Sequence, residues 1–204
     1  MTNEEKIINT AEKLFLEKGL NNVETSELAK LSGVNRTSIY RYYSSKIEMA
    51  FPIMQKYLTE LFTFDILDEG KKTGYQKYSE YMLQAADRFC ANIDKVRFIR
   101  SFDIAFEVAD DLSGKAAEYE EWMRNFEYPG MRYYLDGLKD SSILDDGFGK
   151  MTHLAIVNTL MGLASRVLPR ESTYIYEYGI GRTILLHGLQ LQLRAIRMPT
   201  GQSK

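Results

Sequence analysis

The fold is decided by the stretch Thr25-Ser-Glu-Leu-Ala-Lys-Leu-Ser-Gly-Val-Asn-Arg-Thr-Ser-Ile-Tyr-Arg-Tyr-Tyr-Ser-Ser-Lys46. It predicts a helix, a turn at Gly33, a second short helix over about Arg36 to Tyr43, and the start of a third. Apolar residues are spaced so that they can pack against each other across that turn: Leu28, Ala29, Leu31, Val34 and Ile39. This is the pattern of a helix-turn-helix, the unit that lays its second helix in the DNA major groove.

The same stretch carries donors, hydroxyl groups and positive charge on its other positions. The candidate DNA-binding residues are Thr25, Arg36, Thr37, Ser38, Tyr40, Arg41, Tyr42 and Lys46. Residues 26–46 have a net charge of +3, whereas the whole chain has a net charge of −2. A short basic run is often only a solvated helix face. Its coincidence with the helix-turn-helix pattern favours a DNA footprint confined to one end of the chain.

Capping signals extend the helical prediction on both sides of this stretch. Thr2 with Glu5 predicts a capping box that opens the first helix, and Ser45 with Glu48 predicts another. Thr25 suits the N-cap of the second helix, and Asn35 suits that of the third. Pro52 lies inside the fourth helix, where a missing donor and a steric clash predict a kink or a break.

Helical periodicity continues to the C-terminus, so the fold class is all-α. Further helices are expected from about Tyr75 to Phe89, over 94–108, from 115 to 138 with an interruption near Pro129, and over 150–167 and 172–195. The predicted domains are a three-helix DNA-binding domain at 1–46 and a larger helical domain at 47–204. Tyr43 is expected in a core or an interface rather than on DNA.

Composition limits the alternatives. The chain has 204 residues, of which 45% are hydrophobic, so a sizeable core is expected. A single cysteine, Cys90, excludes an intrachain disulfide and fits a reducing compartment; it is expected to be a buried small hydrophobe. The sequence has neither a signal-peptide pattern nor a run of about 18 uninterrupted apolar residues. These features predict a cytoplasmic protein that does not enter a membrane.

The first quarter of the chain resembles the TetR/AcrR family of one-component bacterial transcription regulators. The resemblance rests on Ile8…Ala11-Glu-Lys-Leu-Phe…Lys18-Gly19, on Thr25, and on Leu28-Ala29…Ser32-Gly33-Val34. It is completed by Ile39-Tyr40-Arg41-Tyr42-Tyr43 followed by Ser45-Lys46. The resemblance implies a homodimer, a double-stranded DNA operator of pseudo-palindromic sequence, and a C-terminal domain that dimerises and holds a small-molecule pocket. In the family, helix four transmits the ligand signal, and Pro52 departs from that pattern.

The resemblance also implies a role for each candidate residue of the helix-turn-helix. Thr25 and the N-terminus of the second helix would contact phosphate. Arg36, Thr37 and Ser38 would face base edges, and Arg36 or Arg41 could pair bidentately with a guanine. Tyr40 and Tyr42 would reach the backbone or bases through their hydroxyl groups. Lys46 would hold a phosphate from the first turn of the fourth helix.

The aromatic content of the larger domain suggests an effector pocket, because a tyrosine sealed in a core needs a partner for its hydroxyl group. An apolar or aromatic small-molecule effector is therefore expected, with core packing as the alternative. The candidate ligand-binding residues are Tyr78, Met82, Phe89, Phe102, Asp103, Phe106, Trp122 and Tyr133. Asp103 could recognise a cationic ligand, although pairing with Arg100 or with solvent is the favoured interpretation.

The last two helices carry the candidate dimer interface: Leu154, Val157, Met161, Gly181, Leu185, Gly188 and Leu189. His153 and His187 are isolated on apolar helices and are interpreted as core or interface residues, so no metal site is predicted. No cofactor is predicted, and no nucleophile elbow or Walker loop suggests an enzyme.

The sequence therefore predicts a ligand-responsive transcriptional repressor. Two alternatives remain: a DNA-binding regulator controlled by a protein partner, and a helical ligand carrier or enzyme whose helix-turn-helix is incidental.

Overall fold

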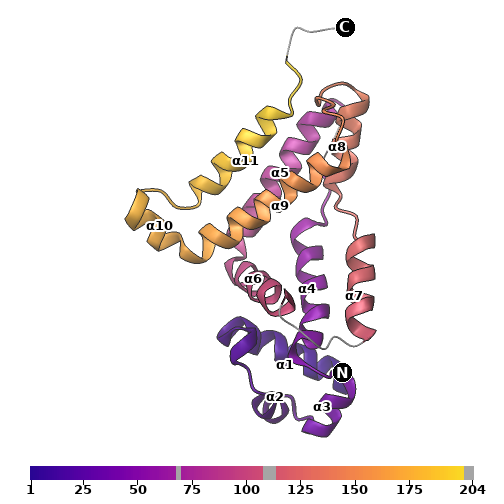
Figure 1. Ribbon diagram of the computed structural model, residues 1–204, viewed down its shortest axis with the longest axis vertical. Coiled ribbons are helices and arrows are strands. Elements are labelled where there is room, and N and C mark those ends of the chain that lie inside the picture. The colour runs from indigo at the N-terminus through magenta and orange to yellow at the C-terminus, as the bar shows by residue number, and fades with distance from the viewer. Residues whose placement is uncertain (68–69, 108–113, 200–204) are drawn as a thin grey trace. The chain divides into compact units, whose positions relative to one another are not determined.

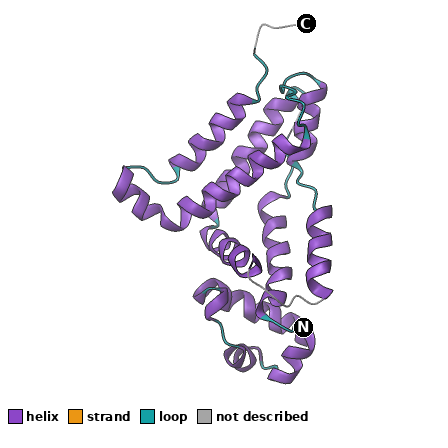
Figure 2. Ribbon diagram, viewed as in Figure 1, coloured by secondary structure: helices purple, strands orange, loops and turns teal. Residues whose placement is uncertain are grey.

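The structure is a computed structural model that describes residues 1–67, 70–107 and 114–199 (Figure 1). Its described residues form helices joined by loops, together with one isolated β-bridge between Ile143 and Arg197 (Figure 2). The chain divides into two compact units. The first contains Met1–Glu60 and Asp94–Phe126, and the second contains Leu61–Ile93 and Glu127–Lys204.

The first unit is built on α1 (Asn3–Lys18), α2 (Thr25–Ser32), α3 (Arg36–Tyr42), α4 (Lys46–Phe62), α6 (Ile93–Glu107) and α7 (Gly114–Asn125), with a short 3-10 turn at Leu20–Asn22. The capping box at Thr2 and Glu5 is confirmed, since each side chain accepts a hydrogen bond from the other residue's backbone N–H. The apolar face of α1, formed by Ile7, Ala11, Leu14 and Phe15, is buried. Amphipathic burial thus fixes α1 as the base on which α2 packs.

The second unit is built on α5 (Gly74–Ala91), α8 (Gly130–Lys139), α9 (Lys150–Val167), α10 (Glu171–Tyr178) and α11 (Thr183–Ala195), with a 3-10 turn at Leu168–Arg170. α5 packs against α8, α9 and α11. The approach of α5 to α8 depends on glycine: a Cβ atom at Gly74 would lie 2.0 Å from the backbone nitrogen of Gly137. The backbone N–H of Gly74 also donates to the Asp140 carboxylate at 2.7 Å.

The interruption predicted near Pro129 is confirmed, because α7 ends at Asn125 and α8 begins at Gly130. Two other expectations are corrected. α4 runs unbroken through Pro52, so the predicted break is wrong, whereas the alternative of a kink stays a prediction. The final helix predicted over 172–195 is two helices, because Gly179 takes a left-handed backbone conformation with φ +71° and ends α10.

The helical stretch Lys150–Tyr178 is long and apolar enough to cross a membrane by length and composition, with a mean hydropathy of 1.2 in its 18-residue window. Of that window, 39% is buried within the protein. Core helices of proteins outside membranes meet the same criterion, so the stretch is weak evidence for a membrane span.

Candidate nucleic-acid interface

The predicted helix-turn-helix is present as α2, a turn and α3. Gly33 ends α2 in the left-handed conformation, with φ +68°, which glycine adopts without a steric cost. Asn35 caps α3 by accepting a hydrogen bond from the backbone N–H of Ser38 at 2.8 Å. The side chains of Leu28, Val34 and Ile39 are at most 4% exposed and form the apolar base of the motif. The turn and the cap therefore hold α3 at a fixed angle to α2.

Three details of this region differ from the sequence prediction. The N-cap of α2 is Glu24 and not Thr25, which is the first helical residue. Leu31, expected in the apolar base, is 59% exposed. At the start of α4, the Glu48 N–H donates to Ser45, but the Glu48 carboxylate accepts from the backbone of Ser44 at 2.6 Å rather than from that of Ser45. Helix ends are the least certain feature of a sequence prediction because caps compete over one or two residues.

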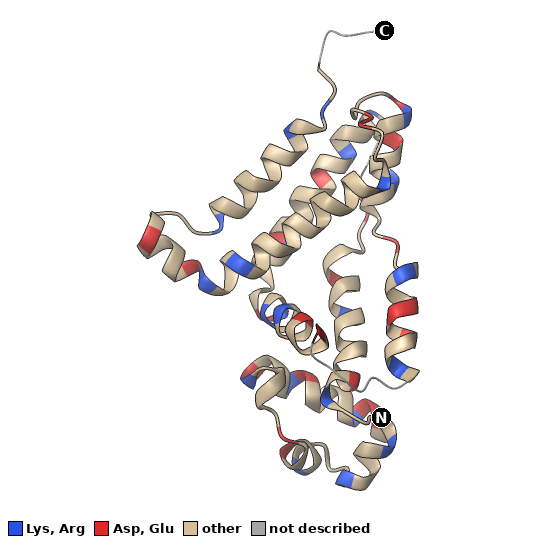
Figure 3. Cartoon of the chain, in the orientation of Figure 1, with Lys and Arg blue, Asp and Glu red and all other residues tan. Residues whose placement is uncertain are grey.

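The outer face of α3 is polar and carries no acidic residue (Figure 3). Arg36, Thr37, Tyr40 and Arg41 are exposed, whereas Ser38 and Tyr42 are half-buried. Arg41 lies over the Tyr42 ring, with its guanidinium carbon 5.5 Å from the ring centroid. Base-reading side chains project from the recognition helix toward solvent, and the first turn of α3 presents Arg36 and Thr37 as exposed side chains.

Tyr40 joins the two helices of the motif at their outer surface. Its hydroxyl group lies 3.4 Å from the Thr25 hydroxyl oxygen, at the first residue of α2. This hydrogen bond, with Arg36 nearby, lowers the pKa of Tyr40. Phosphate binding favours hydroxyl groups beside a helix N-terminus and a guanidinium group, and these three side chains combine them.

Lys46 lies in the first turn of α4 and is half-buried. Its ammonium donates to the backbone carbonyl of Asn21 at 2.9 Å. Because an ammonium has three donors, this bond leaves capacity for a phosphate oxygen. Tyr43, predicted to lie in a core, is 4% exposed and donates to the Glu4 carboxylate at 2.9 Å. Burial and the adjacent carboxylate raise its pKa, so it serves the packing of the first unit.

The candidate ligand-binding residues divide between the two units. Phe102, Asp103, Phe106 and Trp122 belong to the first unit, in a chain of ring contacts that runs through Tyr119. Phe102 is buried, whereas Phe106 and Trp122 are half-buried. Asp103 is exposed on the surface of α6, yet partial desolvation raises its pKa to about 6. An ion pair with Arg100 is not among the salt bridges of the described residues.

The other four candidates, Tyr78, Met82, Phe89 and Tyr133, are at most 4% exposed in the second unit. The Tyr78 hydroxyl group lies 3.0 Å from Nδ1 of His153. The Tyr133 hydroxyl accepts from the backbone N–H of Ile66 at 2.8 Å, and the Tyr81 hydroxyl donates to the Phe62 carbonyl at 2.7 Å. These hydroxyl groups have partners inside the unit, so their desolvation cost by itself does not require a pocket.

His153 is fully buried, as expected for a core histidine, and burial lowers its pKa to about 4. The imidazole is therefore neutral at pH 7. The Tyr78 hydroxyl can donate to Nδ1 or accept from it, so this contact is compatible with either tautomer of the ring. Within the part of the chain that the structure describes, Nε2 has no hydrogen-bond partner. A buried polar atom without a partner costs about 1–3 kcal/mol.

The candidate dimer residues lie mostly inside the second unit. Val157, Leu185 and Leu189 are at most 1% exposed within a single chain, which leaves them almost no surface for a second chain. Leu154, Met161 and Gly188 are half-buried, and Gly181 is buried. A Cβ atom at Gly181 would lie 2.8 Å from the Glu171 side chain, so this glycine permits the turn between α10 and α11 to close. Other apolar side chains of α9, α10, α11 and the loop between the last two are exposed: Met151, Ile175, Tyr176, Tyr178, Ile180 and Leu191.

Sequence reasoning missed the partners of the helix-turn-helix that are distant in sequence. The Asn21 carbonyl that holds Lys46, and the Glu4 carboxylate that holds Tyr43, carry no local signal. Among the described residues, no group of three or more His, Cys, Asp or Glu side chains could hold a metal ion.

The first unit contains a helix-turn-helix motif with an exposed polar face. The sequence pattern of the family "Bacterial regulatory proteins, tetR family" matches residues 7–51, which span the motif. A Staphylococcus aureus protein described as "HTH-type transcriptional regulator SAB2452" is 30% identical over 86 residues, which are 40% of this chain. The chain spans about half the length (46%) of that curated relative. The chain is thus similar to the TetR family of bacterial regulatory proteins over residues 7–51, which contain the helix-turn-helix.

Solved structures agree with this fold over the whole chain. A bacterial regulatory protein in the tetR family from Rhodococcus RHA1 is 15% identical with a TM-score of 0.66, over 98% of this chain and 99% of that one. A putative TetR-family transcriptional regulator from Vibrio parahaemolyticus is 14% identical with a TM-score of 0.62, over 97% of this chain and 100% of that one. At this level of identity the likeness concerns the fold alone.

Proposed function

We propose that this chain is a ligand-responsive transcriptional repressor that binds a pseudo-palindromic operator as a homodimer. The observation that carries the DNA-binding part is the exposed face of α3, with Arg36, Thr37, Tyr40 and Arg41 above a buried apolar base. In this proposal α3 lies in the major groove, Arg36 and Thr37 read base edges, and Thr25, Tyr40 and Lys46 contact phosphates. A two-fold dimer places the two copies of α3 about 34–36 Å apart, one turn of DNA.

Dimerisation is supported by the exposed apolar side chains of α9, α10 and α11. Ile175 is 54% exposed, Tyr176 is 92% exposed and Leu191 is 52% exposed. Large apolar side chains that a single chain leaves exposed are typical of an interface between copies of a chain. We expect Leu191→Arg to shift the mass measured by light scattering from dimer to monomer. Leu144→Arg, at an exposed leucine outside these helices, is the matched control and should leave the mass unchanged.

The effector is proposed to be small and apolar or aromatic. Phe106 and Trp122, both in the first unit, are half-buried and offer ring faces to such a ligand. A ligand that favours a dimer with another spacing of α3 releases the DNA by linkage, without chemistry on the ligand.

The test is fluorescence-anisotropy binding to a duplex selected from a random pool, compared with an unselected duplex, across a salt series. We expect tight binding to the selected duplex, a steep decrease with salt, and saturation at two or four chains per duplex. Equal weak binding to both duplexes would contradict the proposal. The selected duplex then serves to screen compounds that release it.

A further inference from the structure

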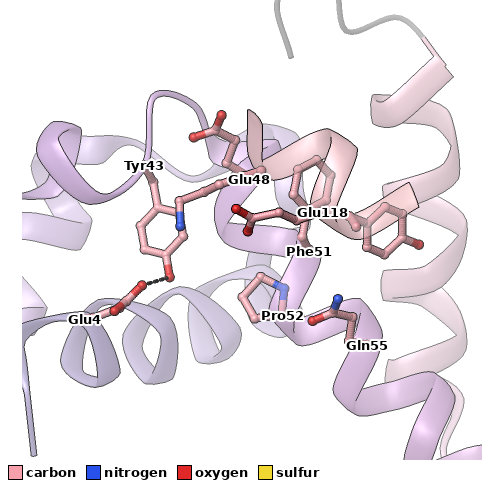
Figure 4. Close-up of a pocket in the computed structure, with 9 residues that line it drawn as sticks. Glu4, Tyr43, Glu48, Phe51, Pro52, Gln55 and Glu118 are labelled. Carbon is pink, nitrogen blue, oxygen red and sulfur yellow. Dashed lines mark hydrogen bonds between the residues drawn. The ribbon is translucent and has the colours of Figure 1, made fainter. Parts of the chain in front are cut away.

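Two tyrosines near the C-terminal end of α3 contact their surroundings in different ways. Tyr43, the C-cap of α3, is 4% exposed, and its hydroxyl group donates to the Glu4 carboxylate of α1 (Figure 4). This contact holds the end of α3 against the rest of the first unit. Tyr40 lies on the outer face of α3 and is 49% exposed, so the role of its hydroxyl group lies at the surface.

The Tyr40 hydroxyl group joins a residue of α2 to a residue of α3. It lies 3.4 Å from the hydroxyl oxygen of Thr25, the first residue of α2. Arg36 lies one turn before Tyr40, and residues at this spacing are neighbours on one face of a helix. Hydrogen bonds with Thr25 and with Arg36 both lower the pKa of Tyr40. The three side chains therefore form one hydrogen-bonded relay, from Thr25 through Tyr40 to Arg36.

The donors and acceptors of the relay are compatible with this order. A guanidinium group has only donors, so the phenol oxygen accepts from Arg36 and can donate its own hydrogen to Thr25. Arg36 needs only part of its N–H donors for a guanine and keeps others for Tyr40. Thr25 lies at the N-terminus of α2, where a phosphate oxygen is favoured. In the proposed complex, one end of the relay would meet the DNA backbone and the other a base.

We propose that Tyr40 is a positioning residue, which holds the Arg36 guanidinium for base reading in register with the phosphate contact at Thr25. This role of Tyr40 rests on the proposed function and changes one assignment in it, because the phosphate contact is left to Thr25. An exposed arginine has many rotamers, and holding it before DNA arrives reduces the entropy lost on binding. Because Arg36 reads a base, the relay favours the selected duplex over random DNA.

The first measurement uses the free full chain. The mobility of the Arg36 side chain is followed by the heteronuclear NOE of its Nε–H group, which the spectrum of Arg36→Ala assigns. We expect Tyr40→Phe to lower this NOE and to leave that of Arg41 unchanged, since adjacent residues of a helix do not face each other. An Arg36 NOE that stays the same in Tyr40→Phe overturns the proposal.

The second measurement is a double-mutant cycle on the selected and the random duplex, followed by anisotropy. Tyr40→Phe should weaken binding to the selected duplex by about fivefold, as for one lost hydrogen bond, and binding to the random duplex by less than about twofold. In the Arg36→Ala background, the same change should cost less than about twofold on either duplex. The control is the cycle of Tyr40→Phe with Arg41→Ala. Arg41 is exposed on the same helix and lies over the Tyr42 ring, so these effects should be additive.

The proposal is overturned if Tyr40→Phe weakens both duplexes by the same factor, which is the result expected for a phosphate contact of its hydroxyl group. It is also overturned if the loss on the selected duplex is absent, or is the same with and without Arg36. A failure of the proposed function is distinguishable, because the unchanged chain would then bind both duplexes equally. Urea unfolding of each variant separates a loss of affinity from a loss of stability.

Discussion

The two compact units use the same side chain, tyrosine, in opposite ways. In the helix-turn-helix, Tyr40 is 49% exposed and its hydroxyl group lies at the surface beside Thr25. In the second unit, Tyr78 and Tyr81 are fully buried, and their hydroxyl groups meet His153 and the Phe62 carbonyl. An exposed phenol remains available to a ligand such as DNA, whereas a buried one must be satisfied within the fold. The role of each tyrosine therefore follows from what its hydroxyl group meets.

Low pH should have the largest effect, because it acts on His153, the partner of the buried Tyr78 hydroxyl group. The pKa of His153 is about 4 in the folded chain, against an ordinary value of 6.5. Between these values the unfolded chain binds a proton that the folded chain does not, so stability falls as pH decreases. The loss should reach about 3 kcal/mol at pH 4, since each pKa unit corresponds to about 1.4 kcal/mol. Urea unfolding at pH 7 and at pH 4 measures it.

Other carboxylates also titrate in this range, so a variant isolates the histidine. His153→Gln should remove most of the loss of stability between pH 7 and pH 4 that is assigned to His153. This holds whatever effect the substitution has on stability at pH 7. His187→Gln changes an exposed histidine and should leave the pH dependence as it was. An unchanged pH dependence in His153→Gln would show that this imidazole is not buried in its neutral form.

The next largest effect is expected for DNA affinity, at the exposed surface of the helix-turn-helix. Arg36→Ala should weaken binding to the selected duplex by about 1–3 kcal/mol while binding to random DNA changes much less, because a base contact carries discrimination. Anisotropy on both duplexes measures it. The matched control is Arg100→Ala, at an exposed arginine of α6 outside the motif. Equal losses on both duplexes would assign Arg36 to the DNA backbone instead.

Local sequence signals predicted the helix-turn-helix well. Gly33 and Asn35 act through the backbone within three residues, so the turn and the cap could be placed from the sequence alone. Helical spacing predicted most of the buried face of the motif. It wrongly placed Leu31 in that face, because spacing does not tell which edge of a short helix is left uncovered. At Pro52 the sequence leaves a kink and a break open, and α4 continues through the proline as one helix although that residue lacks a backbone donor.

The larger domain was less predictable because its contacts join distant residues. The pairing of Tyr78 with His153, and the approach of Gly74 to Gly137, have no local pattern. Apolar spacing predicts the dimer residues on α9 and α11. It does not distinguish a helix face that packs within the chain from one that packs against a second chain. Val157 and Leu185 pack within the chain, whereas Leu191 is exposed.

A matched pair of substitutions sharpens the comparison directly. Tyr81→Phe removes the donor to the buried Phe62 carbonyl and should cost about 1–2 kcal/mol of unfolding free energy, with DNA affinity unchanged. Tyr40→Phe should leave stability within about 0.5 kcal/mol and weaken DNA binding. Urea unfolding and anisotropy are measured on both variants. A stability loss in Tyr40→Phe as large as that in Tyr81→Phe would remove the distinction between the two hydroxyl groups.

The smallest expected effect tests whether Lys46 belongs to the DNA-binding face or to the fold. Its ammonium bonds the Asn21 carbonyl, which is a structural contact, but it retains donors for a phosphate. Lys46→Gln should weaken binding to selected and random duplexes by the same factor and lower the slope of affinity against salt concentration by about 1. Lys56→Gln, at an exposed lysine of α4 paired with Glu12, is the control and should keep the slope. If the slope is unchanged in Lys46→Gln while stability falls, Lys46 acts through Asn21, and the phosphate contact at the start of α4 has to be assigned elsewhere.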